Sequence, residues 1–141
     1  MKAFLDTSVL VATFYADHEH HEPSIELFLR YPKDEVCCGA HSLAEVYASL
    51  TGMPGKERVS ADEAMLFLSN IRDRLSLITL TNEEYFQTME GSAAIGIIGG
   101  GVYDAVLGSC ALKAGAETLY TWNVRHFRRL SPDIAARVAT P

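Results

Sequence analysis

Four polar side chains stand alone in four of the most apolar stretches of this chain. They are three acids, each the only formally charged residue of its stretch, and one amide: Asp6 in residues 4–16, Glu45 in residues 36–55, Asp104 in residues 95–112 and Asn123 in residues 118–124. Apolar stretches of this kind usually become buried strands and helices. An isolated carboxylate in such a place is driven toward its neutral form unless something compensates its charge.

Carboxylates that converge on one place repel one another unless a cation lies between them. Oxygen ligands of this kind suit Mg²⁺ or Mn²⁺, which bind few protein carboxylates and keep several water molecules. The pattern therefore favours one shared divalent-cation site, with Asp6, Glu45 and Asp104 as its ligands and Asn123 beside them.

Each of the four residues also has a simpler explanation. Asp6 is well placed to cap a following helix, and Asn123 is a residue type common at caps and turns. Glu45 alone fits the solvent-facing side of an amphipathic helix. Asp104 alone fits the first turn of a helix, where the dipole favours an anion. The joint pattern favours a shared site over four unrelated explanations.

The elements that must position these residues follow from apolar runs and cap signals. Strands are predicted at residues 2–5, 35–40, 75–80 and 118–121, with a further edge strand near 137–139. Helices are predicted at residues 8–16, 23–32, 42–51, 60–74, 81–95, 103–114 and 123–130, with a glycine turn at Gly96 and residues 99–101. Short apolar strands that alternate with helices indicate an α/β fold with a parallel sheet covered on both faces. Active sites of such sheets lie at the carboxyl ends of strands, where Asp6 and residues 121–123 fall.

The composition fits one folded domain, residues 1–141, with 48% hydrophobic and 21% charged residues. A net charge of −6 argues against holding nucleic acid by bulk positive charge. One local basic cluster lies beside Asn123 and consists of Arg125, His126, Arg128 and Arg129. This cluster either contacts phosphates or is a solvated helix end, and Trp122 either stacks on a base or packs in the core.

The cysteines and the apolar runs favour a cytoplasmic location. Cys37, Cys38 and Cys110 match neither a disulfide framework nor a zinc site, so we expect free thiols in a reducing compartment. No run of about 18 or more uninterrupted apolar residues exists, and the N-terminus is a weak match to a signal peptide. We therefore expect no membrane segment.

Three blocks follow one another along nearly the whole chain: FLDTSVLVA from Phe4, SLAEVYASL from Ser42 and GGGVYDAVLGSCALKAGAETLYTWNVRHF from Gly99. The last is the most specific, because an Asp early in an apolar helix is followed by Gly-Ala, a strand and the pattern T-x-N-x-x-H-F. A D-x-x-H-H segment lies at residues 17–21. Together these blocks resemble the PIN-domain ribonucleases, and among them the VapC toxins of bacterial and archaeal toxin–antitoxin pairs.

The resemblance implies a three-layer α/β/α fold with a central parallel sheet of four to five strands, usually as a homodimer. It implies a Mg²⁺- or Mn²⁺-dependent endoribonuclease, a hydrolase, whose three acidic positions fall on Asp6, Glu45 and Asp104. A fourth position is acidic in many members but is Asn123 here, and this amide contributes no charge to a second metal ion. The expected partner is a small DNA-binding antitoxin that inserts a segment into the active groove.

On this basis we expect Asp6 and Asp104 to hold the principal metal ion, which activates water for attack on the RNA phosphodiester. Glu45 is expected to bind through a metal-bound water or to orient the nucleophile, and Asn123 to fix a water or a supporting hydrogen bond. Supporting hydroxyl groups are expected from Thr7, Ser8 and Thr121, and contacts with RNA or antitoxin from Arg125, His126, Arg128, Arg129 and Trp122.

Two other classes of protein remain open. One is another Mg²⁺-dependent phosphate-ester enzyme on a similar sheet, although a phosphatase requires a second Asp where this chain has Ser8. The other is a non-enzymatic PIN-like module that binds a metal for structure or docking. The histidines at positions 18, 20 and 21 lack the H-E-x-x-H spacing of a zinc enzyme and fit a solvated helix end. The glycines at 99–101 lack the Lys-Ser/Thr of a phosphate-binding loop and fit a tight turn.

Overall fold

Five parallel strands form the single sheet of the computed structural model, which describes residues 1–141. In their spatial order they are β3 (Ser76–Ile78), β2 (Val36–Gly39), β1 (Ala3–Leu5), β4 (Thr118–Tyr120) and β5 (Val138–Ala139). All five predicted strands are confirmed, and β5 pairs only with β4 as the expected edge strand.

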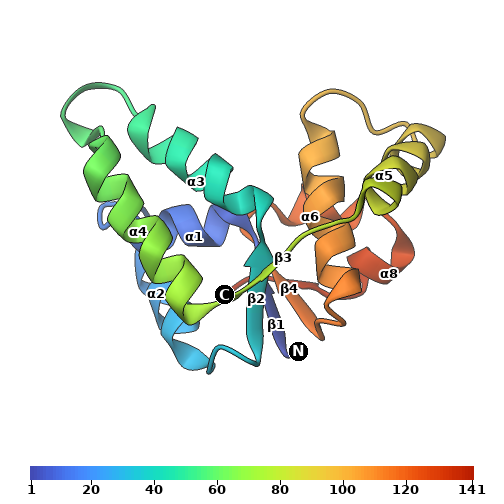
Figure 1. Cartoon of the computed structure of the whole chain (residues 1–141), viewed down its shortest axis with the longest axis horizontal. Coiled ribbons are helices and arrows are strands. Elements are labelled where there is room, and N and C mark those ends of the chain that lie inside the picture. The colour runs from blue at the N-terminus through green and yellow to red at the C-terminus, as the bar shows by residue number, and fades with distance from the viewer.

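Helices cover both faces of this sheet (Figure 1). One layer contains α1 (Thr7–Phe14), α2 (His21–Arg30), α3 (His41–Thr51) and α4 (Ala61–Arg74), and the other contains α5 (Asn82–Ala94), α6 (Gly101–Lys113), α7 (Val124–Arg128) and α8 (Pro132–Ala135). Figure 1 shows the sheet nearly edge-on between the two layers. The predicted three-layer α/β/α fold is therefore confirmed.

Alternate residues of β1 face opposite layers. Ala3 and Leu5 pack in the core with α1–α4, whereas Phe4 packs in the core with α5–α8. All three are fully buried. Because both faces of the sheet are covered, its central strands are apolar at every position, which explains the unbroken apolar run in the sequence.

The strand order decides where a site can form. β1 lies between β2 and β4, so the chain fills one half of the sheet before it crosses to the other side of β1. Ligands of such sheets bind in the crevice beyond the carboxyl ends of the two strands at this crossing. Leu5 pairs with Tyr120, and the Asp6 N–H donates to the Tyr120 carbonyl oxygen at 3.0 Å. The residues that follow β1 and β4 therefore enter the crevice side by side.

Several element boundaries differ from the predictions for local reasons. α6 begins at Gly101 rather than at Tyr103, so Gly101 belongs to the helix. Of the glycines at 99–101 only Gly99 takes a left-handed backbone, with φ of 59°, at the start of the turn that leads into α6. Neither the short 3₁₀ helix η1 (Gly55–Glu57) nor α8 was predicted. α8 is a single turn that Ser131 caps and Pro132 opens, and it is too short for an apolar period to reveal.

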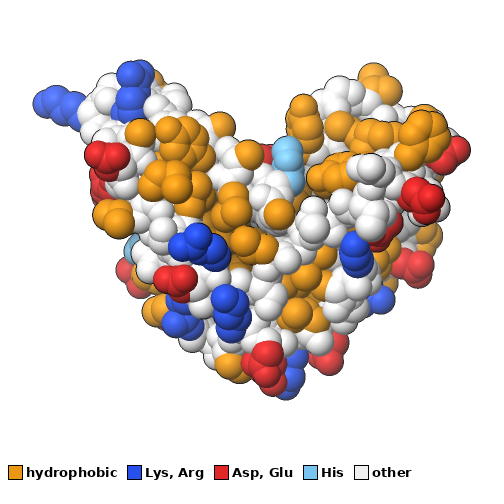
Figure 2. Space-filling view, viewed as in Figure 1, with side chains coloured by type: hydrophobic (Ala, Val, Ile, Leu, Met, Phe, Trp, Pro, Cys, Tyr) orange, Lys and Arg blue, Asp and Glu red, His pale blue; other side chains and the backbone are white.

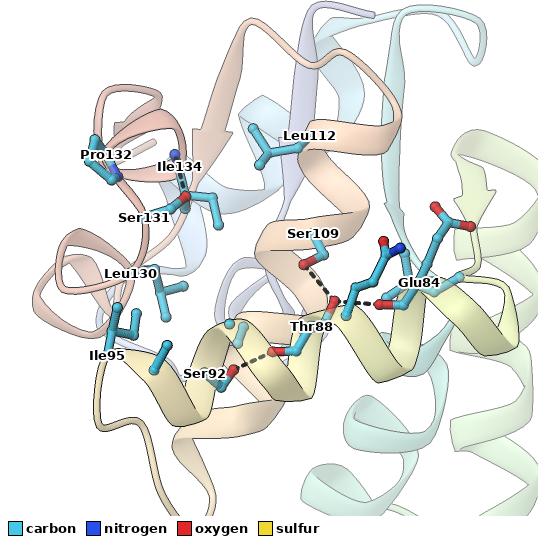
Figure 3. Close-up of a pocket in the computed structure, with 15 residues that line it drawn as sticks. Glu84, Thr88, Ser92, Ile95, Ser109, Leu112, Leu130, Ser131, Pro132 and Ile134 are labelled. Atoms are coloured by element: carbon cyan, nitrogen blue, oxygen red, sulfur yellow. Dashed lines mark hydrogen bonds between the residues drawn. The ribbon is translucent and has the colours of Figure 1, made fainter.

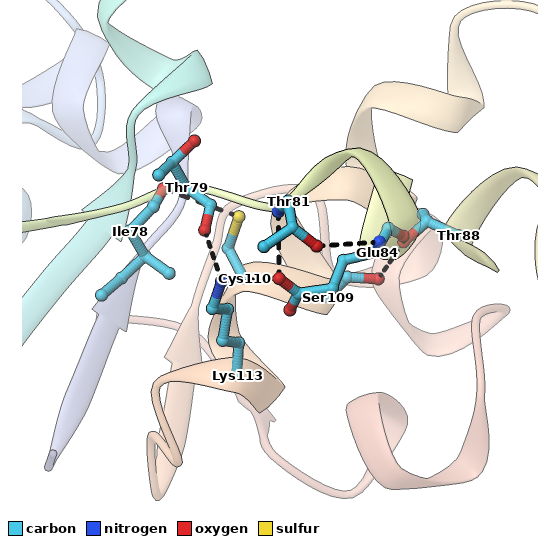
Figure 4. A network of polar contacts seen from close by, with 8 residues as sticks. All are labelled: Ile78, Thr79, Thr81, Glu84, Thr88, Ser109, Cys110 and Lys113. Atoms are coloured by element: carbon cyan, nitrogen blue, oxygen red, sulfur yellow. Dashed lines mark hydrogen bonds and ion pairs between the residues drawn. The ribbon is translucent and has the colours of Figure 1, made fainter. Parts of the chain in front are cut away.

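A polar network fastens the start of α5 to the end of α6 (Figure 4). Thr81 Oγ1 accepts from the Glu84 N–H, and Glu84 Oε1 accepts from the Thr81 N–H, so the two residues form a capping box. Lys113 Nζ lies 2.6 Å from the same Glu84 oxygen and 2.9 Å from the Thr79 carbonyl oxygen. The bond from Lys113 is the main reason that the pKa of Glu84 is lowered to about 2.

The surface shows two arms with a hollow between them (Figure 2), and the arms are α3 with α4 and α5 with α6 (Figure 1). Large hydrophobic side chains are exposed on both arms: Met65 and Leu66 on α4, Tyr85, Phe86 and Met89 on α5, Ile95 and Ile98 in the following loop, and Tyr103 on α6. The three cysteines are free and buried. None of the helices combines the length and the apolar character that a bilayer crossing needs.

Candidate active site

Asp6 is the buried centre of the crevice between β1 and β4. It is 2% exposed, and its Oδ2 accepts hydrogen bonds from Ser8 Oγ and Thr121 Oγ1, both at 2.7 Å, and from the Ser8 N–H at 3.4 Å. The bond from the Ser8 N–H caps α1, so Asp6 is a helix cap as well as a member of the crevice. All three of these hydrogen bonds are made to Oδ2, and Asp6 lines the cavity described below.

Glu45 reaches the same crevice from the middle of α3. Its Oε1 lies 3.0 Å from Thr7 Oγ1, and that hydroxyl also lies 2.9 Å from Ser42 Oγ. His41, one turn earlier on α3, places Nε2 3.7 Å from the same Oε1. The Glu45 side chain is 31% exposed, so it is neither a fully solvated helix residue nor a sealed core residue.

Asp104 comes from the first turn of α6, as predicted, and its side chain is 19% exposed. Its Oδ2 lies 3.4 Å from Nδ1 of His126 on α7. Burial raises the pKa of Asp104, and the positive charge of the Arg129 guanidinium, which packs against Gly101 at the same end of α6, opposes this rise. Part of the predicted basic cluster therefore faces this carboxylate directly.

Asn123 lies at the cap position of α7, but its side chain makes no capping hydrogen bond. Its N–H donates to Thr121 Oγ1 at 2.9 Å, the same hydroxyl that donates to Asp6. The exposed amide side chain lines the crevice. Thr121 thus links Asn123 to Asp6. The three predicted supporting hydroxyl groups, those of Thr7, Ser8 and Thr121, each contact an acidic side chain of the crevice.

These side chains line one cavity of about 480 Å³. Its walls are Asp6, Thr7, Ser8, Val11, His18, Glu19, His20, Glu45, Ser49, Asp104, Trp122 and Asn123. All four residues singled out from the apolar stretches are therefore brought together. The prediction of a solvated helix end for His18 and His20 is wrong, because both rings are half-buried in the wall of the cavity. Only the D-x-x-H-H likeness pointed to them in the sequence.

Of the remaining predicted contact residues, Trp122 lies in the cavity wall, and His126 and Arg129 flank Asp104. Arg125 and Arg128 are exposed on α7 and do not line the cavity. The basic cluster is therefore divided between the rim of the site and the open surface beside it.

Burial raises the pKa of all three carboxyl groups above their ordinary values. In Asp6 the hydrogen bonds from Ser8 and Thr121 oppose this effect. The negative charge of Asp6 further raises the pKa of Glu45 and of Asp104, so the three acids share one electrostatic environment. A cation among them relieves both the burial of charge and the mutual repulsion.

The donor set suits a hard divalent cation, because it consists of carboxylate and amide oxygens in a polar cavity. No three His, Cys, Asp or Glu side chains are already gathered as a ready-made metal cluster. Mg²⁺ does not require one, since it binds proteins through one or two carboxylates and keeps its other positions for water and phosphate oxygens. The residues present therefore fit this kind of ion.

A second cavity, of about 570 Å³, lies between α5, α6 and α8 (Figure 3). Its walls are largely apolar, and the hydroxyl groups of Thr88 and Ser109 in it bond to each other at 2.9 Å. Its one carboxylate, Glu84, is already paired with Lys113. Converging acids are found only in the first of these two cavities, which makes the crevice at β1 and β4 the candidate site.

The sequence matches the family model of the PIN domain over residues 3–131. It is 33% identical over 114 residues to ribonuclease VapC40 of Mycobacterium tuberculosis, a match that covers 81% of each chain. It is 31% identical over 114 residues to ribonuclease VapC27 of the same organism, covering 80% of this chain and 79% of the other.

Solved structures share the fold. VapC20 of Mycobacterium tuberculosis, a toxin that cleaves the sarcin–ricin loop, superposes with a TM-score of 0.71 and 20% identity over 89% of this chain and 92% of its own. VapBC2 of Rickettsia felis, bound to a DNA fragment from its promoter, superposes with a TM-score of 0.68 and 20% identity over 99% of this chain and 98% of its own. VapBC-1 of nontypeable Haemophilus influenzae superposes with a TM-score of 0.67 and 16% identity, also over 99% of this chain and 98% of its own. The family match and the relationship to VapC40 show that the chain belongs to the PIN-domain family, among its VapC-like ribonucleases.

Proposed function

We propose that this protein is a metal-dependent endoribonuclease, with Mg²⁺ or Mn²⁺ as its cofactor, and the toxin of a type II toxin–antitoxin pair. The observation that carries the proposal is the convergence of Asp6, Glu45 and Asp104 on one cavity at the β1–β4 crossing. Membership of the VapC-like ribonucleases supports the reaction class. The reaction is hydrolysis of an RNA phosphodiester bond.

Asp6 and Asp104 hold the ion, whose chemistry when bound is to polarise the phosphate and to lower the pKa of a water molecule. Ser8 and Thr121 fix the Asp6 carboxylate through its Oδ2, and Oδ1 is the oxygen that we assign to the ion. Glu45 is held at Oε1 by the Thr7 hydroxyl and orients the attacking water with its remaining lone pairs.

Positive charge near the phosphate comes from the rim of the cavity. His126 and Arg129 flank Asp104, and Arg125 and Arg128 extend the basic surface beside it. Asn123 adds an amide that is free of any capping role and holds a water molecule or a substrate oxygen. These local contacts are needed because the whole chain carries a net charge of −6.

The partners that we propose are an antitoxin and a second copy of this chain. Two of the similar solved structures are VapBC proteins, one of them bound to DNA. The exposed hydrophobic side chains on both arms form an apolar surface of the kind that partners cover (Figure 2). We expect the protein to act in the cytoplasm, where its three free thiols remain reduced.

The first prediction concerns the acidic ligands. Asp6→Asn and Asp104→Asn each remove a negative charge from the metal site at nearly constant side-chain volume. We expect each to lower the rate of Mn²⁺-dependent cleavage of single-stranded RNA by at least about 100-fold, more than the effect typical of residues that only support a ligand. EDTA is expected to abolish the cleavage by the wild-type protein, and added Mn²⁺ to restore it.

Asp73→Asn is the matched control, because Asp73 is an exposed acid on α4 outside the cavity and its loss is expected to leave the rate unchanged. Full metal-dependent cleavage by Asp6→Asn or by Asp104→Asn contradicts the proposal. Tight metal binding by the wild-type protein without any turnover instead identifies a non-enzymatic binding module.

A further inference from the structure

Three aromatic rings form one wall of the cavity that holds the carboxylates. His18 and His20 come from the connection between α1 and α2, and Trp122 follows β4. The His20 and Trp122 rings are stacked, with centroids 3.7 Å apart and planes 7° from parallel. The His18 ring lies 5.6 Å from that of His20 at an angle of 42°. We call these three residues the aromatic wall.

The aromatic wall is held in place and is linked to the acidic site. Trp122 Nε1–H donates to the hydroxyl of Ser24, a fully buried residue of α2, at 2.9 Å. The Trp122 backbone N–H donates at 3.0 Å to Ser8 Oγ, which itself donates to Asp6 Oδ2 at 2.7 Å. Two hydrogen bonds therefore separate Trp122 from the buried carboxylate, and Trp122 is held by both its ring N–H and its backbone N–H.

A purely structural role for Trp122, which would connect α2 to the end of β4, explains its hydrogen bond to Ser24. It does not explain the position of His20. The His20 side chain is 36% exposed and lines the cavity rather than closing it. Its Nε2 is 3.4 Å from Glu19, a side chain that is 81% exposed, so this contact does little to hold the ring. The ring therefore presents aromatic surface to whatever occupies the cavity.

We propose that the aromatic wall is a stacking subsite for a nucleobase next to the cleaved phosphate of RNA. This inference rests on the proposed function, since it names how the same site holds its substrate. Stacking on aromatic rings tolerates every base and needs no positive charge on the protein. That suits a chain with a net charge of −6, whose cavity is already lined by four acidic residues, Glu19 among them. The base extends the stack of His20 on Trp122, and its phosphate lies toward Asp6.

The test uses the tryptophan of the wall itself, because Trp122 is the only tryptophan of the chain. Fluorescence of the Asp104→Asn protein is titrated with a ten-nucleotide single-stranded RNA and with the same RNA carrying one abasic residue at successive positions. We expect the intact RNA to quench Trp122 fluorescence. At one or two positions the abasic residue is expected to remove the quenching and to weaken binding about tenfold.

Two substitutions separate stacking from a structural role. In the same background His20→Ala is expected to bind intact and abasic RNA equally, whereas His20→Phe, which keeps an aromatic ring, retains the difference. Thermal unfolding of both variants checks that the fold is kept. Equal binding of intact and abasic RNA by the parent protein overturns the inference. The inference is also overturned if His20→Ala still binds intact RNA more tightly than abasic RNA. It is overturned as well if His20→Ala keeps its affinity for RNA and loses affinity only for an antitoxin peptide.

The outcome is distinct from that of the proposed function. Base-dependent quenching without cleavage by the wild-type protein supports the subsite and contradicts the nuclease. Metal-dependent cleavage with no effect of any abasic residue supports the nuclease and contradicts the subsite.

Discussion

At the scale of single residues, Asp6 shows how one carboxylate serves two purposes. Its Oδ2 accepts the bond that caps α1 and two bonds from hydroxyl groups, and these bonds oppose the cost of burying the charge. None of these three bonds is made to Oδ1, the oxygen that we assign to the proposed metal ion. The helix cap and the proposed metal ligand are therefore complementary roles of the two oxygens, although in the sequence they are alternatives.

The second prediction follows from the raised pKa of Glu45. Burial, with the charges of Asp6 and Asp104, makes the ionised form of Glu45 less favourable in the folded state than in the unfolded state. The stability linked to its protonated form is present below its ordinary pKa of 4.5 and is lost as the pH rises through the raised value. Glu45→Gln removes this loss of stability, because glutamine does not ionise, and it keeps an oxygen that accepts from the Thr7 hydroxyl. In EDTA at pH 7 we expect Glu45→Gln to unfold at a higher temperature than the wild type.

The difference between the two proteins is expected to shrink as the pH falls toward 4, where the wild-type side chain becomes neutral as well. Added Mn²⁺ is expected to stabilise the wild type more than Glu45→Gln, because the variant lacks one of the charges that the ion compensates. Calorimetry across this pH range measures both effects. A lower unfolding temperature for Glu45→Gln in EDTA at pH 7 contradicts the prediction.

At the scale of elements, polar contacts rather than apolar packing align the start of α5 with the end of α6. The capping box closes the first turn of α5, and Lys113 reaches from α6 to both Glu84 and the Thr79 carbonyl oxygen (Figure 4). α5 buries only Ser92 completely, so it contributes little to either core. Its attachment therefore depends on these contacts more than the attachment of α6 does.

The third prediction tests this attachment with Glu84→Gln, which keeps an acceptor for the Thr81 N–H but loses the ion pair with Lys113. We expect a lower urea midpoint at pH 7. Since the folded pKa of Glu84 is lowered to about 2, its contribution is present above 4.5 and is lost as the pH falls toward 2, so the difference from wild type is expected to shrink over that range.

Glu63→Gln is the matched control for this prediction. Glu63 has the same position in α4 after its cap residue Ser60, but it forms neither the reciprocal bond nor an ion pair. Its substitution is expected to leave the midpoint unchanged. Equal effects of the two substitutions refute a specific role for the contact between Glu84 and Lys113.

At the scale of the whole molecule, two hydrophobic cores share one sheet. One core joins α1–α4 to the sheet and the other joins α5–α8 to its opposite face. Because β1 contributes Ala3 and Leu5 to the first core and Phe4 to the second, neither core persists when the sheet is lost. The candidate site depends on both layers, since Glu45 comes from one and Asp104 from the other.

The fourth prediction is that both cores unfold together. Leu10 lies in the core with α1–α4 and Leu107 in the core with α5–α8, and both are almost completely buried. Leu10→Ala and Leu107→Ala are each expected to lower the free energy of unfolding by about 2–5 kcal/mol. Urea transitions followed by Trp122 fluorescence and by far-UV circular dichroism are expected to coincide in both variants. Separate transitions for the two probes mean that the layers unfold independently.

The sequence by itself determined the strands, most of the helices and the four residues that stand alone in apolar stretches. These follow from local signals. The apolar run of a strand that is buried on both faces, the cap residue at the start of a helix and the glycine at its end can each be recognised within about ten residues. The family likeness rests on the same short motifs. Neither α8 nor the exact start of α6 was predicted, because short turns carry weak local signals.

Only the tertiary structure decided which of these residues meet. The hydroxyl of Thr121 reaches Asp6 across 115 positions, and Trp122 reaches Ser24 across 98. Such pairs exist because β4 is placed beside β1 in the sheet, and no local pattern states that order. His18 and His20, expected at a solvated helix end, lie in the wall of the candidate cavity. The acids could be identified from the apolar residues around each of them in the sequence. Their neighbours in the cavity are set by the placement of β4 beside β1.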